Sequence, residues 1–302
     1  MFVVRYRKIF FALTGLIVAA SIGLFFLYGL NIGTDFTGGT LIEARYEGAR
    51  PSVDELSGSL TESGLKGFSI RGAGEDAYIV RAESLTNDVR AALPAAVSVK
   101  GVYKADIERL TDVGPSVGSE LRTKALLSLT LVILCIVLYV AFAFRKVSEP
   151  ISSWAYGFIT IATLVHDVIV PVGAFALFGH LWGAPVDVLF VTAILTILGF
   201  SVHDTIVVFD RVRENLRINQ ETRRKEDFEL VVGKSIEQTF VRSINTSVTV
   251  LISLGALFFM GPAATQDFAL TLIVGIVAGA YSSVVFATPL LITWERWKAK
   301  RS

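Results

Sequence analysis

Residues 187–215 read "DVLFVTAILTILGFSVHDTIVVFDRVREN" and place an ionisable pair inside a long apolar run. The run from Asp187 to Phe209 is long enough to cross a bilayer, which takes about 20 apolar residues in a helix. His203 and Asp204 fall inside it, and Asp204 lies about 7–8 Å before its charged end at 1.5 Å per residue. A charge at this depth costs at least ~2.5–3.5 kcal/mol on insertion scales. We therefore expect the pair to face a bundle interior and treat it as a functional candidate.

Five further apolar stretches are long enough to cross a bilayer. They cover residues 9–30, 125–144, 152–178, 243–260 and 268–294. The mean hydropathy of +0.60 is too apolar for a soluble chain of 302 residues. The fold class predicted is thus an α-helical polytopic membrane protein with six transmembrane helices. The first stretch is too long for a cleaved signal peptide, and we expect it to be a retained anchor.

Basic residues fall on one side of the predicted spans. Arg145 and Lys146 lie between spans two and three, eight Lys or Arg occur in residues 211–242, and more follow span six. The loops 179–186 and 261–267 contain none. The positive-inside rule then places both termini in the cytoplasm. The net charge of +1 gives no bias towards nucleic acid, and the single cysteine, Cys135, allows no internal disulfide.

The segment between spans one and two changes pattern completely. Residues 31–122 alternate like strands at "TLIEARY", "FSIRG", "AYIVRAE" and "VSVKGVYKADIERL". Helices are expected at "SVDELSGSLTESG", ending at Gly64, and at "LTNDVRAAL", stopped by Pro94. The order β-α-β-β-α-β predicts a small α+β ferredoxin-like extracytoplasmic domain. Residues 1–30 would then form the cytoplasmic N-terminus and first span, and residues 123–302 the other five spans.

Residues 211–242 form the second substantial polar segment. Six residues, five of them apolar, recur there at helical spacing among charges: Phe228, Val231, Val232, Ser235, Ile236 and Phe240. One interpretation is an amphipathic helix on the cytoplasmic membrane face. The other is a solvated linker helix that packs on its own neighbours, and the pattern does not decide between them.

Polar groups recur inside several spans. "VHDVIV" at 165–170 and "VHDTIV" at 202–207 each place a histidine beside an aspartate. In span five, a polar stripe within about 100° of the helical wheel should face partners rather than lipid; its members are Arg242, Asn245, Thr246, Thr249 and Ser253. The alternatives are structural: an interhelical hydrogen bond at Asp167 or Asp204, tuning or structural roles for His166 and His203, and an Arg242 that reaches the interface.

Enzymatic chemistry has little support in these residues. Ser201, His203 and Asp204 are too close on one helix to form a nucleophile relay, and no phosphate-binding loop occurs. A metal held by the three histidines with Asp167 and Asp204 lacks ligand spacing, so we expect neither metal nor cofactor. Burial and a nearby arginine act in opposite directions on a carboxyl pKa. An aspartate between helices could therefore take up and release protons, with protons as the coupling ion.

Four motifs together resemble the SecF family of bacterial protein export. They are "GTDFTGGT" at 33–40, "LVHDV" at 164–168, "DTIVVFDRVREN" at 204–215 and "QTFVRSINTS" at 238–247. The resemblance covers almost the whole chain. It implies a subunit of the resistance–nodulation–division superfamily in the bacterial inner membrane, paired with a homologous six-span SecD. Such a complex uses the proton-motive force to pull exported polypeptide.

The resemblance also assigns residues and partners. The family's span-four Asp corresponds to Asp204, its span-five Arg to Arg242 and its span-three Asp to Asp167, with His203 where many relatives have Asn. The implied partners are SecD, the Sec translocon channel, a membrane insertase, unfolded preprotein and the lipid bilayer. The alternatives are a proton-driven exporter of small molecules or lipids from the same superfamily, and a purely structural translocon subunit.

Two glycine motifs complete the candidate residues. Gly33, Gly38 and Gly39, around Asp35, permit tight turns where the chain leaves the membrane, and we favour this role over direct contact with polypeptide. The pair in span six, Gly275 and Gly279, forms G-x-x-x-G and allows close helix approach. That approach could occur within the bundle or against SecD.

Overall fold

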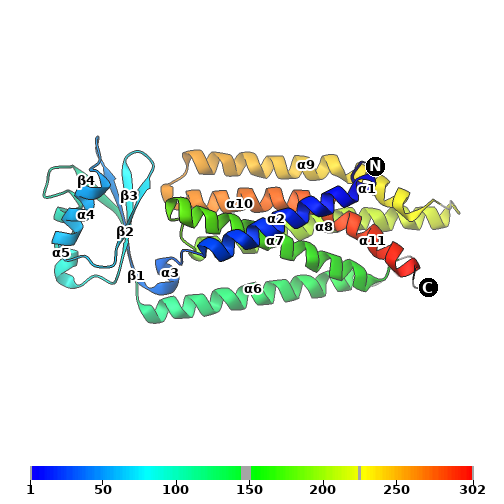
Figure 1. Ribbon diagram of the computed structural model, residues 1–302, viewed down its shortest axis with the longest axis horizontal. Coiled ribbons are helices and arrows are strands. Elements are labelled where there is room, and N and C mark those ends of the chain that lie inside the picture. Colours follow the sequence, from blue (N-terminus) through cyan, green and yellow to red (C-terminus); the bar gives the residue numbers. More distant parts are fainter. Residues whose placement is uncertain (1, 144–150, 224–225, 301–302) are drawn as a thin grey trace. The chain divides into compact units, whose positions relative to one another are not determined.

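The computed structural model describes three stretches of the chain, residues 2–143, 151–223 and 226–300 (Figure 1). They divide into two compact units. The sheet unit comprises residues 31–127 and 179–188, and the bundle unit comprises the other described residues. Arg145 and Lys146, on which the predicted orientation partly rests, lie outside the described residues.

The sheet unit runs strand, helix, strand, strand, helix, strand. Its elements are the single-turn helix α3 (Thr34–Thr37), then β1 (Gly39–Tyr46), α4 (Val53–Glu62), β2 (Ser69–Ala73), β3 (Ala77–Ala82), α5 (Asn87–Val97) and β4 (Ala105–Val113). The strands form one antiparallel sheet in the order β2-β3-β1-β4. Ile42 and Val80 of the sheet meet Leu56, Leu60 and Leu93 of the two helices in a fully buried core. Each such side chain contributes about 1.5–3 kcal/mol by its burial.

Two details of this unit differ from the sequence prediction. Helix α5 does not stop at Pro94 but continues to Val97. Leu93 and Val97 are buried in the core, and this packing holds the last turn although proline cannot donate a backbone hydrogen bond. The final strand begins at Ala105 rather than near residue 97, because positive φ angles at residues 99 and 100 turn the chain first.

Six helices in the described ranges are long and apolar enough to cross a membrane, as the hydropathy predicted. The helical elements are the short α1 (Phe2–Arg5), α2 (Arg7–Tyr28), α6 (Pro115–Ala143), α7 (Ser153–Trp182), α8 (Val188–Glu221), α9 (Phe228–Met260), α10 (Ala263–Ser282), the π-helical turn η1 (Ser283–Ala287) and α11 (Thr288–Ala299). The last three form one continuous span. These spans indicate a multi-pass membrane protein.

Burial divides the six spans into two groups. At least 44% of the most apolar window is buried in α7, α8 and the last span, against at most 17% in α2, α6 and α9. The first group is therefore the core of the bundle unit. The second group leaves apolar faces uncovered by this chain, so lipid or another helix must cover them.

Helix α8 continues three turns beyond Phe209, where the apolar run ends. Ion pairs at i,i+3 spacing support this polar extension: Arg213 with Asp210 at 2.6 Å and Arg211 with Glu214 at 2.9 Å. Such pairs stabilise exposed helix by a few tenths of a kcal/mol each. The extension runs beside the first turns of α9, so residues 211–221 and 228–242 form the two facing ends of long helices.

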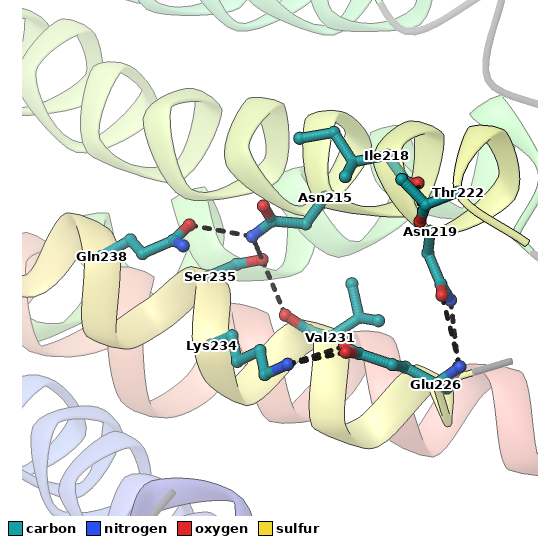
Figure 2. Close-up of polar contacts among 9 residues, drawn as sticks. All are labelled: Asn215, Ile218, Asn219, Thr222, Glu226, Val231, Lys234, Ser235 and Gln238. Atoms are coloured by element: carbon teal, nitrogen blue, oxygen red, sulfur yellow. Dashed lines mark hydrogen bonds and ion pairs between the residues drawn. The ribbon is translucent and has the colours of Figure 1, made fainter. Parts of the chain in front are cut away.

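A polar clamp joins these two helix ends (Figure 2). The side-chain amide of Asn215 donates to Ser235 Oγ and to Gln238 Oε1, each at 2.9 Å. Asn219 bonds the backbone of Glu226 twice, at 3.1 Å to its carbonyl and at 3.3 Å from its N–H. Directional bonds at two levels fix the axial register of α8 against α9.

The residues of this segment that recur at helical spacing are mostly buried. Five of the six residues predicted to form an amphipathic face are buried inside the chain: Phe228, Val231, Val232, Ser235 and Ile236. Phe240 is exposed. The buried side chains pack on the chain's own helices and are not free to rest on a bilayer.

The first turn of α4 gives a pH-dependent prediction. Glu55 Oε2 accepts hydrogen bonds from the backbone N–H and the hydroxyl of Ser52, both at 2.8 Å, in a capping box. These bonds lower the pKa of Glu55 below its ordinary value of 4.5. The cap therefore stabilises α4 above that pH and is lost as the pH falls through the folded-state pKa.

We expect amide hydrogen exchange in α4 of the full chain, corrected for intrinsic rates, to accelerate across this acid range. Glu55→Gln should remove the pH dependence and raise exchange at neutral pH. Glu75→Gln, in the β2–β3 turn, is the control and should leave α4 unchanged. A Glu55→Gln chain with the wild-type pH dependence would contradict the capping role.

Candidate functional site

Asp167, in the middle of α7, is completely buried. Nδ1 of His166 lies 2.7 Å from one carboxyl oxygen, Oδ1. The hydroxyl of Ser201 on α8 donates a hydrogen bond to the other, Oδ2. Both oxygens therefore have partners, and the bond from Ser201 joins α7 to α8.

The ring of His166 lies among aromatic residues of the last span. Its centroid is 6.1 Å from that of Tyr281 and 5.8 Å from that of Phe286. The Tyr281 hydroxyl is in turn 2.6 Å from Thr14 Oγ1 on α2. Among the described residues, His166 Nε2 has no hydrogen-bond partner. One nitrogen of the ring is thus committed to Asp167 and the other is available.

Asp204 lies one helical turn beyond Ser201 on α8 and is only 3% exposed. Its Oδ2 finds no hydrogen-bond partner in the part of the chain that the structure describes. The neighbouring Thr205 Oγ1 is 3.0 Å from Ser283 Oγ, in the π-helical turn η1. Turns of this kind occur often at functional sites. Asp204 is therefore the buried carboxyl with unused hydrogen-bonding capacity.

His203 and Arg242 are placed differently from the two aspartates. Both side chains are exposed on the surface of the chain. His203 directly precedes Asp204 on α8, and Arg242 lies on α9. Successive residues of a helix are 100° apart, so Asp204 faces inward while His203 faces out.

The polar stripe of α9 is also left uncovered by the chain's own helices. Arg242, Asn245, Thr249 and Ser253 are exposed. Thr249 and Ser253 donate to backbone carbonyls of their own helix, at 2.8 Å and 3.2 Å. These hydroxyls can therefore remain satisfied in lipid, whereas the Arg242 guanidinium needs water, headgroups or a partner.

The structure thus brings together only some of the residues predicted to handle protons. His166 and Asp167 meet directly, while His203, Asp204 and Arg242 do not bond to them. Sequence reasoning missed the role of Ser201, although its position three residues before Asp204 puts it on the same helix face. It also missed Ser283, because nothing in the local sequence marks the π-helical turn.

Gly275 and Gly279 both face α8. A Cβ at Gly275 would overlap the side chain of Ile197, and one at Gly279 would come within 3.1 Å of Ser201 Cβ. The close approach of this G-x-x-x-G pair is therefore made inside the bundle. It brings α10 against the part of α8 that carries Ser201 and Asp204.

The "GTDFTGGT" residues lie in the sheet unit. Gly39 has a φ of +122°, and a Cβ there would come within 2.5 Å of the Ala82 carbonyl oxygen. Gly33 donates from its N–H to the carbonyl of Val186 at 2.8 Å. Asp35 Oδ2 accepts from the N–H of Val188, the first residue of α8, at 3.1 Å. These contacts hold residues 33–39 against residues 82 and 186–188. Gly38 turns the chain at a φ of +79°.

No group of three His, Cys, Asp or Glu side chains in the described ranges is arranged to hold a metal ion. His166 is buried in the bundle unit, His203 is exposed, and His180 belongs to the sheet unit. The side chains that meet at the site carry carboxyl, imidazole and hydroxyl groups.

Comparison with known proteins gives consistent results. Residues 95–297 match the family described as "Protein export membrane protein SecD/SecF, C-terminal". The protein translocase subunit SecF of Thermobaculum terrenum is 40% identical over 97% of this chain and 93% of its own length. The protein translocase subunit SecDF of Thermus thermophilus is 34% identical over 96% of this chain and 38% of its own.

A solved structure agrees with these sequences. The crystal structure of SecDF from Thermus thermophilus, described as a translocon-associated membrane protein, superposes with a TM-score of 0.83 at 32% identity. It covers 97% of this chain, which spans 38% of the SecDF chain.

The contact of Gly275 with Ile197 predicts a stability change. Gly275→Ala should lower the free energy of unfolding by about 1–3 kcal/mol, because the added methyl group overfills a packed interface. Combined with Ile197→Ala, it should cost less than the sum of the two single changes, since the cavity accepts the methyl group. Gly255→Ala, with open space around it, is the control. Thermal unfolding in detergent measures the two single variants, the double variant and the control. If the double variant loses the sum of the two single losses, the contact is contradicted.

The bond between Ser201 and Asp167 gives a second prediction. Ser201→Ala should cost about 1–3 kcal/mol, because it leaves a buried carboxyl oxygen without its donor. Ser253→Ala removes an exposed hydroxyl that bonds its own helix and should cost less than about 0.5 kcal/mol. Equal losses in the same unfolding assay would show that the bond does not stabilise the bundle.

Proposed function

The chain belongs to the SecD/SecF family of protein-export membrane proteins, and from that premise we propose that it couples the proton-motive force to protein export. In this proposal it acts with SecD as a transport subunit rather than as an enzyme. Proton uptake and release at Asp204 drives a change of helix arrangement. That change helps to complete the translocation of preproteins through the Sec channel.

The observation that carries the proposal is the state of the Asp204 carboxyl. It is buried in a membrane span, and its Oδ2 has no hydrogen-bond partner in the described residues. An ionised carboxylate so placed is costly, whereas its protonated form is tolerated. The charged form needs a cation or water, and Arg242 on α9 is the proposed cation. Each protonation state thus favours a different surrounding.

Asp167 has a supporting role in the proposal. Its two oxygens are bonded to His166 and Ser201, so it fixes α7 to α8 near the proton-binding carboxyl. The free Nε2 of His166 offers a route for a proton between the buried groups and the last span. His203, exposed beside Asp204, would tune the charge of the site.

SecD is the proposed partner at the uncovered faces of the bundle. The SecDF relative contains a region like this chain as 38% of one longer chain, which supports a partnership of the two halves. The exposed stripe around Arg242 and the poorly buried helices α2, α6 and α9 are surfaces that a homologous bundle could cover. The Sec channel, an insertase and unfolded preprotein are the further partners proposed.

The sheet unit is proposed to be a ferredoxin-like domain on the extracytoplasmic side of the inner membrane. The alternation of strands and helices and the antiparallel order β2-β3-β1-β4 support this fold. The loops 179–186 and 261–267 contain no Lys or Arg, which supports placing them outside and both termini in the cytoplasm.

Replacement of Asp204 tests the proposal. In inverted vesicles containing SecD and the Asp204→Asn chain, the part of preprotein export that depends on the proton-motive force should fall at least five-fold. The amide keeps the size and hydrogen bonding of the carboxyl but cannot titrate. ATP-driven export without a proton gradient should not change.

Asp210→Asn is the matched control, since Asp210 is exposed and pairs with Arg213 at the helix surface. It should leave the stimulation within a factor of two. If Asp204→Asn assembles with SecD and retains full stimulation, proton coupling at this residue is wrong. A structural translocon subunit would give that result.

A further inference from the structure

An open groove lies between the start of α2 and the end of α11. It has a volume of about 620 Å³ and is lined from the two ends of the chain by Arg7, Lys8, Phe11, Arg296, Trp297 and Lys300. Both helices reach the same end of the bundle unit as the facing ends of α8 and α9 (Figure 1). The groove therefore lies where two membrane-spanning helices end.

The groove carries an excess of positive charge. Glu229 of α9 is shared by two guanidinium groups, with Oε1 3.0 Å from Arg7 Nη1 and Oε2 bonded to Arg296. Glu295 is the other carboxylate at the groove. Four cations against two carboxylates leave two positive charges. Lys8 and Lys300 have no ion pair within the described ranges, so their ammonium groups remain available to a ligand.

The same groove has an aromatic side. Phe11 and Trp297 line it beside the cations, and Trp297 is 49% exposed. Tryptophan at the end of a membrane span is typical of the headgroup level of a bilayer. A ligand that fits both sides has an anionic head and an apolar body.

We propose that this groove binds an anionic phospholipid. The phosphate would lie between Lys8, Lys300 and Arg296, and the acyl chains would follow Phe11 and Trp297 along the apolar faces of α2 and α11. Basic pockets between membrane helices bind phospholipid headgroups in this way. The shared Glu229 holds Arg7 and Arg296 in place before the lipid arrives, so little order must be gained on binding.

A neighbouring hollow shows why this groove is the better site. It is larger, about 890 Å³, and shares Arg7 and Lys8. Three cations, Arg5, Arg7 and Lys8, face two carboxylates there, Asp227 and Glu229, which leaves one positive charge for an anionic ligand. The groove beside α11 exchanges Asp227 for Glu295 but adds Arg296 and Lys300, and the two positive charges left there make it the better site.

Native mass spectrometry of the full chain in detergent tests the proposal. The chain is titrated with cardiolipin, phosphatidylglycerol and phosphatidylcholine. We expect both anionic lipids to bind at least five-fold more tightly than phosphatidylcholine. The double variant Lys8→Gln, Lys300→Gln should lose at least five-fold in affinity for the anionic lipids and none for phosphatidylcholine.

The control removes the same charge from the segment 211–242. Arg217→Gln with Arg223→Gln changes two exposed cations outside the groove and should alter lipid affinity less than two-fold. Equal losses in both double variants would show non-specific attraction and overturn the site. Displacement of bound lipid by inorganic phosphate would assign the site to free phosphate and overturn the lipid as its ligand. Neither readout depends on export activity, so this site and the proposed proton coupling can fail separately.

Discussion

A carboxyl group in the hydrocarbon of a bilayer has no water to bind, so other protein groups must satisfy it. Asp167 meets this demand with His166 on its own helix and Ser201 on the next. Because the donor comes from α8, the two best-buried consecutive spans are held at one relative depth. Gly279 then brings α10 to the same serine, so three spans meet at this polar contact.

Asp204 stands in contrast to that satisfied group. The two aspartates occupy nearly identical hexapeptides, but their surroundings in the fold differ. In α7 both the histidine and the aspartate are buried, whereas in α8 His203 is exposed and Asp204 alone turns inward. Both oxygens of Asp167 thus have partners, whereas Oδ2 of Asp204 has no hydrogen-bond partner among the described residues. The repeat in sequence has produced two unlike environments.

Much of this organisation could be predicted because it rests on length and periodicity. Six apolar stretches gave six spans, and alternating patterns gave the strands of the sheet unit. The extension of α8 to Glu221 could not be read from hydropathy, because ion pairs such as Asp210 with Arg213 hold it. The exposure of Arg242 depends on how α9 rotates against α10. Tertiary packing sets that rotation, and the local pattern does not.

The π-helical turn Ser283–Ala287 has a consequence for the end of the chain. A turn closed by i→i+5 bonds holds one residue more than an α-helical turn, and Thr288 Oγ1 reaches back five residues to the Ser283 carbonyl at 2.8 Å. Every position after it is therefore rotated by about 100° from where the phase of α10 would place it. Loss of one residue from this turn would restore ordinary α-helix and swing Arg296 and Trp297 to another side of the bundle. The number of residues in this turn thus sets the orientation of α11.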